Sequence, residues 1–448
     1  MSTSAATSAA TASPHGFRRL WTATTLSGLG DGLYLMVLPL IALTLTTDPA
    51  LVAGVRVAQT AAGLAFGLFV GVLVDRFDRR RLVVGAEVLR GGAVLALAAA
   101  AAFDALSLPL VFAAAFVVGT AETVVDTAQQ AMVPMVVEPD GLRRANGRIY
   151  GAQTVTNDFV GAPLGALLFA VAAVVGLAVP GGLYLAAAVV LLGLAGRYRV
   201  PRPDTTTTVR RDIREGLAVL WRQTALRRLA VYGAVAGGIN MAFFAVFIVF
   251  AVGDASAMRL SPFGYSLLIT AAAAGAVLGA TLADRISRRL SPPVVLTAVV
   301  VALGLCFGTP ALTPNPYVIG LALAGCGFIA AVGGVVSVSL RQALTPPHLI
   351  GRVGAGSRLL ALAARPLGAL AGGLVAAATS PRTLFVVLAV AILLIVPVTA
   401  RIPSSWTGPA GDPADPGPDP AAPAAAAVPT AVVPPSDPVE SVPQKGIA

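Results

Sequence analysis

The sequence contains few charged residues and almost no lysine. Charged residues make up 12% of the 448 positions, and Lys445 is the single lysine among 31 basic residues. A Walker A phosphate loop requires a lysine beside the phosphates, and a Schiff-base enzyme requires a lysine in its site. Lys445 lies in a tail rich in proline and alanine. The sequence therefore argues against a Schiff-base enzyme and against an ATP-driven pump built from this chain alone.

Histidine and cysteine are equally scarce. The two histidines, His15 and His348, cannot form an HExxH zinc site or a catalytic triad. Cys306 and Cys326 lie in apolar runs without CxxC spacing, so we interpret them as core residues. We therefore expect no enzyme, no metal site and no cofactor. The basic residues form short clusters between apolar runs, which argues against a nucleic-acid partner.

Apolar residues dominate what remains. They account for 56% of the chain, enough for about a dozen membrane spans of roughly 20 residues each. The first apolar run is too long for the core of a signal peptide. The sequence predicts an all-α integral membrane protein with twelve transmembrane helices. Their expected ranges are 20–45, 50–74, 82–103, 108–133, 146–171, 173–196, 227–251, 263–283, 293–311, 316–340, 350–377 and 382–400.

The composition divides the chain into five segments. We expect a disordered N-terminal segment at 1–16, a six-helix bundle at 17–196, a cytoplasmic central loop at 197–222, a second six-helix bundle at 223–401 and a disordered tail at 402–448. The tail is rich in proline and alanine and has too little apolar surface to form a core. The central loop contains RRDIREGLAVLW, which could form an amphipathic helix at the membrane surface.

The distribution of arginine predicts the orientation of the helices. Alternate connections between the spans are rich in arginine, whereas the other connections hold only Arg259 and Arg382. Cytoplasmic loops are enriched in basic residues, so we expect both termini in the cytoplasm. The preference for arginine, alanine, glycine and proline is typical of a GC-rich bacterial genome. We therefore expect a multi-pass protein of the plasma (inner) membrane.

Three motifs recur about half a chain apart. Their recurrence predicts two parallel six-helix repeats, a construction typical of secondary transporters whose halves rock about a site at the midplane. The pairs are DRxxRR at Asp75 and Asp284, QAMVP and QALTP at Gln130 and Gln342, and PLGAL at Pro163 and Pro366.

The stretch GVLVDRFDRR at residues 71–80 resembles the GxxxDRxxRR signature of the major facilitator superfamily. The resemblance covers about residues 17–401, and within the family the chain is similar to twelve-helix exporters of drugs, macrolides and siderophores. Supporting stretches are Gly30-Asp31, Ala145-Asn146 and GAPLG at 161–165. The last of these, with Gly161, Pro163 and Gly165, is similar to the antiporter signature of drug exporters.

The resemblance implies roles for the paired loops and for the helices. It implies a monomer, and a central cavity lined by the first, fourth, seventh and tenth helices. The fourth helix lacks the arginine that many members carry, so proton coupling must use other groups. The loops would switch conformation, or alternatively anchor the helices by their positive charge. Their residues are Gly71, Asp75, Arg76, Arg79, Arg80, Asp284, Arg285, Arg288 and Arg289.

Polar and ionisable residues inside the spans are candidates for a substrate or proton pathway, because a buried charge in a bilayer is costly unless it is paired or faces water. Glu87 is also ionisable and lies in the third span. The candidates are Asp31, Arg56, Arg90, Glu122, Asp126, Asp158, Asn240 and Arg365.

The fourth helix carries the most suggestive pair of these candidates. Glu122 and Asp126 are spaced i, i+4, so both carboxylates lie on one face. Protonation of one would relieve their repulsion, which makes the pair a plausible proton acceptor. Alternatively, Arg90 neutralises Asp126 as a structural pair.

The other candidates also allow a structural interpretation. Asp31 could bind a cationic group or carry a proton, or it could pair with Arg56 or Arg365. Asp158 is open to the same alternatives, and a single buried amide such as Asn240 is commonly a packing residue. Arg365 precedes a proline that tends to kink the helix.

Two glycine-rich faces complete the pattern. The second helix presents Gly63, Gly67 and Gly71, and the eighth presents Gly275, Gly279 and Ala283. Small residues at this spacing predict close helix packing, or alternatively a smooth face for sliding.

These patterns predict a secondary active transporter that exports a small organic molecule, a drug or a natural product, in exchange for protons. Its partners would be the solute and the lipid bilayer, with a proton gradient in place of a cofactor. Two alternatives remain open at this point. The first is uptake or facilitated diffusion of a metabolite, and the second is a membrane sensor that transports nothing.

Overall fold

The computed structural model describes residues 14–138, 141–194, 196, 198, 217–345 and 349–402. Twelve helices of this part of the chain are long and apolar enough to span a membrane, as the sequence predicts. No strand occurs in it, and its single isolated β-bridge joins Val252 and Leu260. Residues 1–13 and 403–448 of the expected disordered ends lie outside the described residues, as does most of the central loop. Residues 14–16 were expected to be disordered, but they form the start of the first helix.

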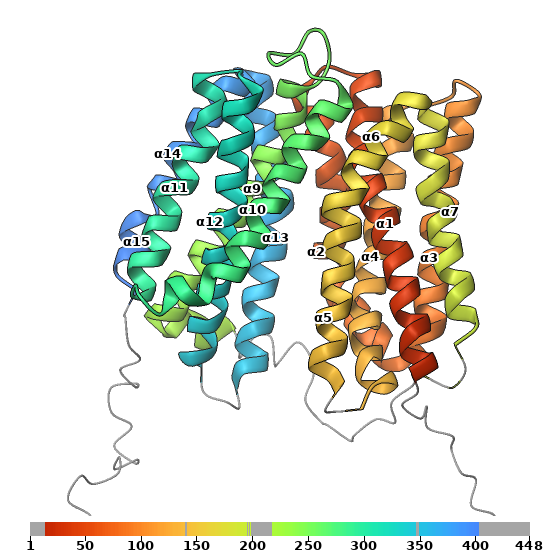
Figure 1. Cartoon of the computed structure of the whole chain (residues 1–448), viewed down its shortest axis with the longest axis horizontal. Coiled ribbons are helices and arrows are strands. Elements are labelled where there is room, and N and C mark those ends of the chain that lie inside the picture. The colour runs from red at the N-terminus through yellow and green to blue at the C-terminus, as the bar shows by residue number, and fades with distance from the viewer. Residues whose placement is uncertain are drawn as a thin grey trace, which may run out of the picture. The chain divides into compact units, whose positions relative to one another are not determined.

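The first six spans form the N-terminal half, which is coloured red to yellow in Figure 1. The fifth span is divided into α5, the π-helix η2 and α6. The elements are α1 (Pro14–Leu45), α2 (Pro49–Arg76), α3 (Arg79–Ala102), α4 (Leu108–Val136), α5 (Leu142–Gln153), η2 (Thr154–Gly161), α6 (Ala162–Val171) and α7 (Ala173–Leu192).

The last six spans form the C-terminal half, coloured green to blue in Figure 1. The final span is divided into α14 and α15. The elements are α9 (Thr224–Ala251), α10 (Pro262–Ser287), α11 (Pro292–Leu312), α12 (Pro316–Ala343), α13 (Ile350–Ala378), α14 (Pro381–Leu393) and α15 (Val396–Ala400).

Proline fixes the start of several of these helices. A first-turn proline lacks only an N–H that the helix would leave unpaired, and a polar residue before it caps the next free amides. Asp48 accepts a hydrogen bond from the Ala50 amide at the start of α2, and Ser261 accepts one from the Gly264 amide at the start of α10. Asn315 caps α12 in the same way. These local signals explain why the expected and observed boundaries agree closely.

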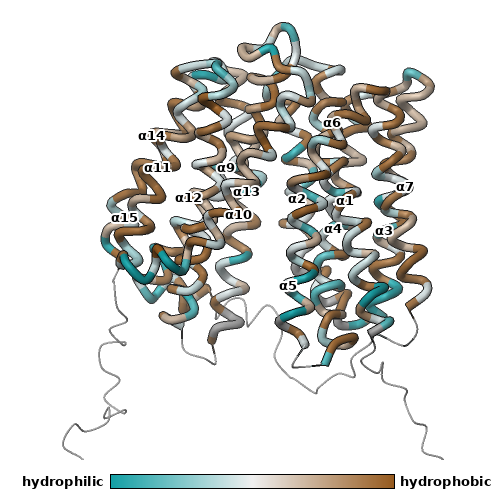
Figure 2. The backbone as a smooth tube through the Cα atoms, viewed as in Figure 1, coloured by the Kyte–Doolittle hydropathy of each residue, from teal (hydrophilic) through white to brown (hydrophobic). Residues whose placement is uncertain are grey.

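The helices are apolar along most of their length, and polar residues gather toward their ends (Figure 2). We call the end that carries the connections 76–79 and 287–292 the arginine-rich end. Within each half, neighbouring helices pack side by side, as in α3 with α7 and α10 with α12. Between the halves, α2 packs against α13 and α9, and α10 packs against α6.

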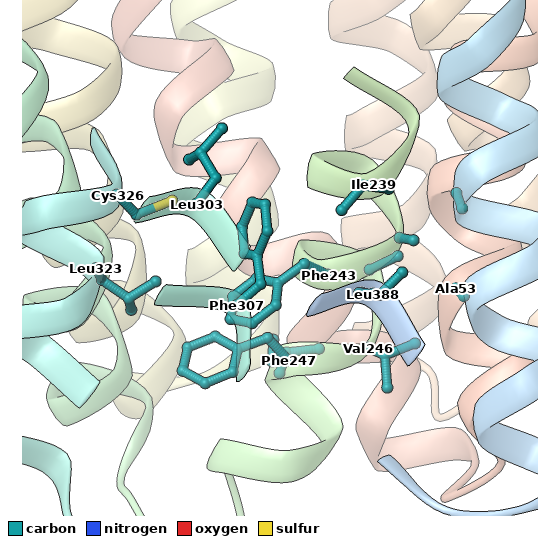
Figure 3. Packing of buried hydrophobic residues seen from close by; sticks show 14 of the residues in the cluster. Ala53, Ile239, Phe243, Val246, Phe247, Leu303, Phe307, Leu323, Cys326 and Leu388 are labelled. Atoms are coloured by element: carbon teal, nitrogen blue, oxygen red, sulfur yellow. The ribbon is translucent and has the colours of Figure 1, made fainter. Parts of the chain in front are cut away.

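An aromatic cluster stabilises the C-terminal half. The ring of Phe243 in α9 stacks on Phe247 at 5.0 Å between centroids, and it lies 5.0 Å from Phe307 of α11 and 5.1 Å from Phe385 of α14. Figure 3 shows the first three of these rings converging among Leu323, Cys326 and Leu388. Cys326 is a core residue here, in agreement with the sequence.

The two glycine faces behave differently. A Cβ atom on Gly275 or Gly279 would clash with the backbone of α12, so these glycines permit close packing, as predicted. A Cβ atom on Gly67 or Gly71 would meet nothing within 4 Å, so the packing prediction is wrong for these two residues, whereas a Cβ on Gly63 would contact Thr123 of α4. Instead, α2 approaches α4 at Gly119, where a Cβ would collide with the backbone of residue 59.

This difference yields a test of the packing. Gly275→Ala should lower the free energy of unfolding by about 1–3 kcal/mol, because α10 and α12 must move apart. Gly67→Ala is the matched control and should cost nothing. The measurement is the thermal unfolding of both variants in detergent, followed by intrinsic fluorescence. Equal midpoints for the wild-type and Gly275→Ala proteins would contradict the proposed contact.

Candidate functional site

A buried ion cluster joins α1, α3 and α7. The Arg90 guanidinium pairs with the Asp31 carboxylate, lies 3.5 Å from Glu87 and donates a hydrogen bond of 3.0 Å to Ser27. It also lies 4.0 Å above the ring of Tyr184, whose hydroxyl donates to Asp31 at 2.9 Å. Arg90 and Glu87 are 1% and 0% exposed. One guanidinium therefore serves two carboxylates in the interior of the bundle.

The cluster corrects two of the pairings considered from the sequence. Arg90 forms its ion pairs with Asp31 and Glu87, not with Asp126. For the same reason Asp31 pairs with Arg90 rather than with Arg56 or Arg365. Counting residues along each helix cannot give the rotation of the helix about its axis, and this rotation decides which charges meet.

A line of polar side chains connects α2 and α4. Arg56 donates to the Gln59 amide oxygen at 3.4 Å, and Gln59 donates to Glu122 at 3.3 Å. The close approach of the helices at Gly119 brings Gln59 within reach of α4. Asp126 lies one turn beyond Glu122, so the line continues along α4 toward the arginine-rich end.

Two of the cavities in the structure lie at the ends of this line. The first, which we call the apolar cavity, has a volume of about 270 Å³ and is lined by α1, α2, η2, α6, α9 and α10. Arg56 and Asn240 are polar residues in its wall, among side chains that include Met36, Met241 and Phe244. Both halves of the molecule contribute to it. Its composition suits a predominantly apolar solute.

The second, which we call the arginine cavity, lies closer to the arginine-rich end. It has a volume of about 430 Å³ and is lined by α2, α4 and α13. Asp126 projects from α4, and Arg358 and Arg365 project from α13. Leu64 lies between Gly63 and Gly67 in the α2 wall, and the two glycines keep that wall thin.

A third cavity, of about 380 Å³, lies between α1, α4 and α5, and Asp126 lines this one as well. Gln130, Asn146 and Gln153 give it a wall of amides. Asp126 and Gln130 are exposed to these spaces, whereas Gln129 is buried and hydrogen-bonded to Thr24. Asp126 therefore stands where two cavities meet, a position that periodicity alone did not indicate.

The residues of these sites that had no role predicted from the sequence include Gln59, Tyr184 and Arg358. Glu87 was noted only as an ionisable residue of the third span. Arg358 could have been found, because it lies seven residues before Arg365 and so on the same helical face. The tenth helix, α12, lines none of the three cavities described, although the family resemblance implied that it would.

The antiporter-like stretch positions α1 against the fifth span. A Cβ atom on Gly161 would lie 2.5 Å from the Cα of Gly32, so the two backbones touch at this point. Gly165 lies against Leu33 in the same way. Pro163 follows in the first turn of α6, and Asp158 belongs to η2, with its side chain outside the described part.

In the described part of the chain, the hydrogen bonds and ion pairs of the two arginine-rich loops join each loop to residues of its own half. Arg79 donates to the Ala131 carbonyl at 3.1 Å, and Arg80 donates to the Leu191 carbonyl at 2.9 Å. Asp284 pairs with Arg288 at 2.7 Å, and its hydrogen bond raises the pKa of that guanidinium. The side chain of Asp75 lies outside the described part. A switching role for these loops stays a prediction.

Comparison with known proteins decides the family. The sequence profile of the Major Facilitator Superfamily matches residues 20–361. The chain belongs to the Major Facilitator Superfamily. With twelve spans, it is a multi-pass transporter of the plasma membrane and not an enzyme.

Individual members of the superfamily are similar along most of the chain. The multidrug efflux pump Tap of Mycolicibacterium fortuitum is 27% identical over 84% of this chain and 93% of its own length. Macrolide efflux protein A of Streptococcus pyogenes is 24% identical over 69% and 77%. The crystal structure of a bacterial homologue of the iron transporter ferroportin has the same fold, with a TM-score of 0.70 and 17% identity over 87% of this chain and 99% of that chain.

The ion cluster yields a stability prediction. Arg90→Met removes the cation from two buried carboxylates and should lower the free energy of unfolding by about 3–5 kcal/mol. The triple variant Arg90→Met, Asp31→Asn, Glu87→Gln removes all three charges and should recover most of that loss. Thermal unfolding of both proteins in detergent provides the comparison. A triple variant no more stable than the single one would refute the account.

Proposed function

We propose that this transporter exports small organic molecules in exchange for protons, by alternating access between its two halves. The observation that carries the proposal is the polar line from Arg56 through Gln59 and Glu122 to Asp126. It begins in the apolar cavity and ends where the other two cavities meet. A change of charge at one end can thus influence binding at the other.

The proton step would use the carboxylates of α4. Glu122 and Asp126 are one turn apart, so two negative charges repel each other along that face. A proton taken up by either carboxylate removes the repulsion and leaves one negative charge for Arg56 and the arginines of α13. Release of that proton restores the repulsion, which provides the two charge states that a coupled cycle needs.

Alternating access would use the contacts between the halves. Away from the arginine-rich end, Gly373 of α13 packs closely on Ala50 and Ala53 at the start of α2. The apolar cavity also takes its walls from both halves. Separation of α2 from α13 would break these contacts and open that cavity to the opposite side of the membrane.

The direction of transport is supported by the relatives, because two of the similar proteins are efflux pumps for drugs or macrolides. The apolar cavity, with two methionines and two aromatic side chains, is suited to solutes of varied shape, since methionine adapts to irregular contacts. Both points favour small, partly apolar organic molecules as cargo.

A cell assay tests this function. Intracellular accumulation of a panel of antibiotics and fluorescent dyes is measured in a pump-deficient bacterium, with and without a protonophore, against an empty vector. The wild-type chain should lower accumulation, and the protonophore should abolish the effect. Glu122→Gln and Asp126→Asn, each removing one charge of the α4 pair, should lose most of the protonophore-sensitive export.

The control variant is Asp104→Asn, at an exposed turn outside the cavities. Asp104 adopts a positive φ of 52°, which asparagine also tolerates. This variant should export as the wild type does. Raised accumulation would point to uptake, and an unchanged level with every compound would point to a sensor. Export that survives both α4 substitutions would contradict the proton step.

A further inference from the structure

Arg358 and Arg365 have no hydrogen bond or ion pair within the part of the chain that the structure describes. Both side chains are exposed to the arginine cavity, and they project from α13 two helical turns apart. The helix is continuous through Pro366, so the two guanidinium groups share one face. Unpaired guanidinium groups inside a membrane protein are costly, and they commonly mark the path of a solute or an ion.

The described residues of the opposite wall do not neutralise these arginines. Asp126 of α4 interacts electrostatically with both, yet neither guanidinium comes within ion-pair distance of it. The other polar side chains of that wall are the hydroxyls of Thr123 and Thr127, which donate to carbonyls of their own helix. Among the described residues, the cavity lining therefore holds two cations and one anion, a formal charge of +1.

The α2 wall leaves room beside the arginines. Gly67 lines the cavity, and a Cβ atom placed on it would meet nothing within 4 Å. Gly63 lies on the same wall, where its nearest neighbours are side chains of Thr123 and Leu362. Gly67, which was predicted to pack, thus borders open space opposite the two guanidinium groups.

We infer that the arginine cavity binds the acidic group of the transported solute, so that the cargo includes organic molecules with a carboxylate or a similar anionic group. Arginine presents a planar fork of N–H donors that matches a carboxylate. An acid group bound between Arg358 and Arg365 would supply the partner that neither guanidinium finds among the described residues. This inference rests on the proposed function, because it names the class of molecule that is exported.

Asp126 has a defined part in this arrangement. Its carboxylate competes with the acidic group of the solute for the same two arginines. While charged, it lowers the affinity for an acid. Removal of its charge should therefore strengthen the binding of acids, whereas loss of either arginine should weaken it.

A binding experiment with two matched dyes tests the inference. The probes are tetramethylrhodamine, which has a free carboxylate, and its ethyl ester, in which the carboxylate is masked. The full-length purified protein is placed in nanodiscs of phosphatidylcholine, so that no anionic lipid headgroup competes. Fluorescence polarisation gives both dissociation constants. The acid should bind about tenfold more tightly than the ester, as a charge-assisted hydrogen bond predicts.

Variants assign the preference to the cavity. Arg358→Gln and Arg365→Gln should each abolish most of the preference for the acid, and Asp126→Asn should increase it. Lysine at either arginine position keeps the charge but loses the fork, so it should restore part of the preference. Arg382→Gln, at an exposed position at the start of α14, is the control and should change nothing.

The outcomes are distinct from those of the cell assay. The inference is overturned if the wild-type protein binds the acid no more tightly than the ester, which includes no binding of either dye. It is also overturned if both glutamine variants are folded and keep the preference. If the cells show energised export but the purified protein shows no preference for the acid, only this inference is contradicted. If the protein prefers the acid but the cells show no export, the proposed function is contradicted.

Discussion

The cost of a charge inside an apolar helix bundle is the constraint on which the rest of this structure depends. A buried ionised side chain requires an opposite charge, a hydrogen-bond donor or water. Arg90 satisfies the first condition with Asp31 and Glu87, in the interior of the N-terminal half. Asp126, Arg358 and Arg365 instead face a cavity large enough to admit water or a solute. The proposed transport chemistry uses this second group.

The two halves differ in the kinds of residue that they bury, despite their repeated motifs. In the part of the chain described, the fully buried charged residues, Glu87 and Arg90, belong to the N-terminal half, and the buried polar residues of the C-terminal half are all serine or threonine. The C-terminal half is instead packed by phenylalanine rings and by the glycine contacts between α10 and α12. The N-terminal half thus holds the buried charges, and the C-terminal half contributes α9, α10 and α13 to the cavities.

Close backbone contacts and open glycines have different consequences in this fold. Gly32 and Gly161 bring α1 against the fifth span, and Gly119 brings α4 against α2, which places Gln59 beside Glu122. Gly67 instead leaves space, and the arginine cavity occupies it. Glycines at the same sequence spacing therefore permit close helix packing in α10 of the C-terminal half and border a cavity in α2 of the N-terminal half.

The sequence by itself determined the helices, because the length of an apolar run and the polar or proline residues at its ends are local properties. It also identified Asp126 and Arg365 as candidates, since any ionisable residue in a span is exceptional. Only the tertiary structure decided that Arg90 belongs to Asp31 and Glu87, that Gly67 borders a cavity, and that Arg358 faces Asp126. These helices are apolar on nearly every side, so no stripe in the sequence reveals their rotation. Side-chain packing between neighbouring helices sets that rotation, and with it the partner of every charge.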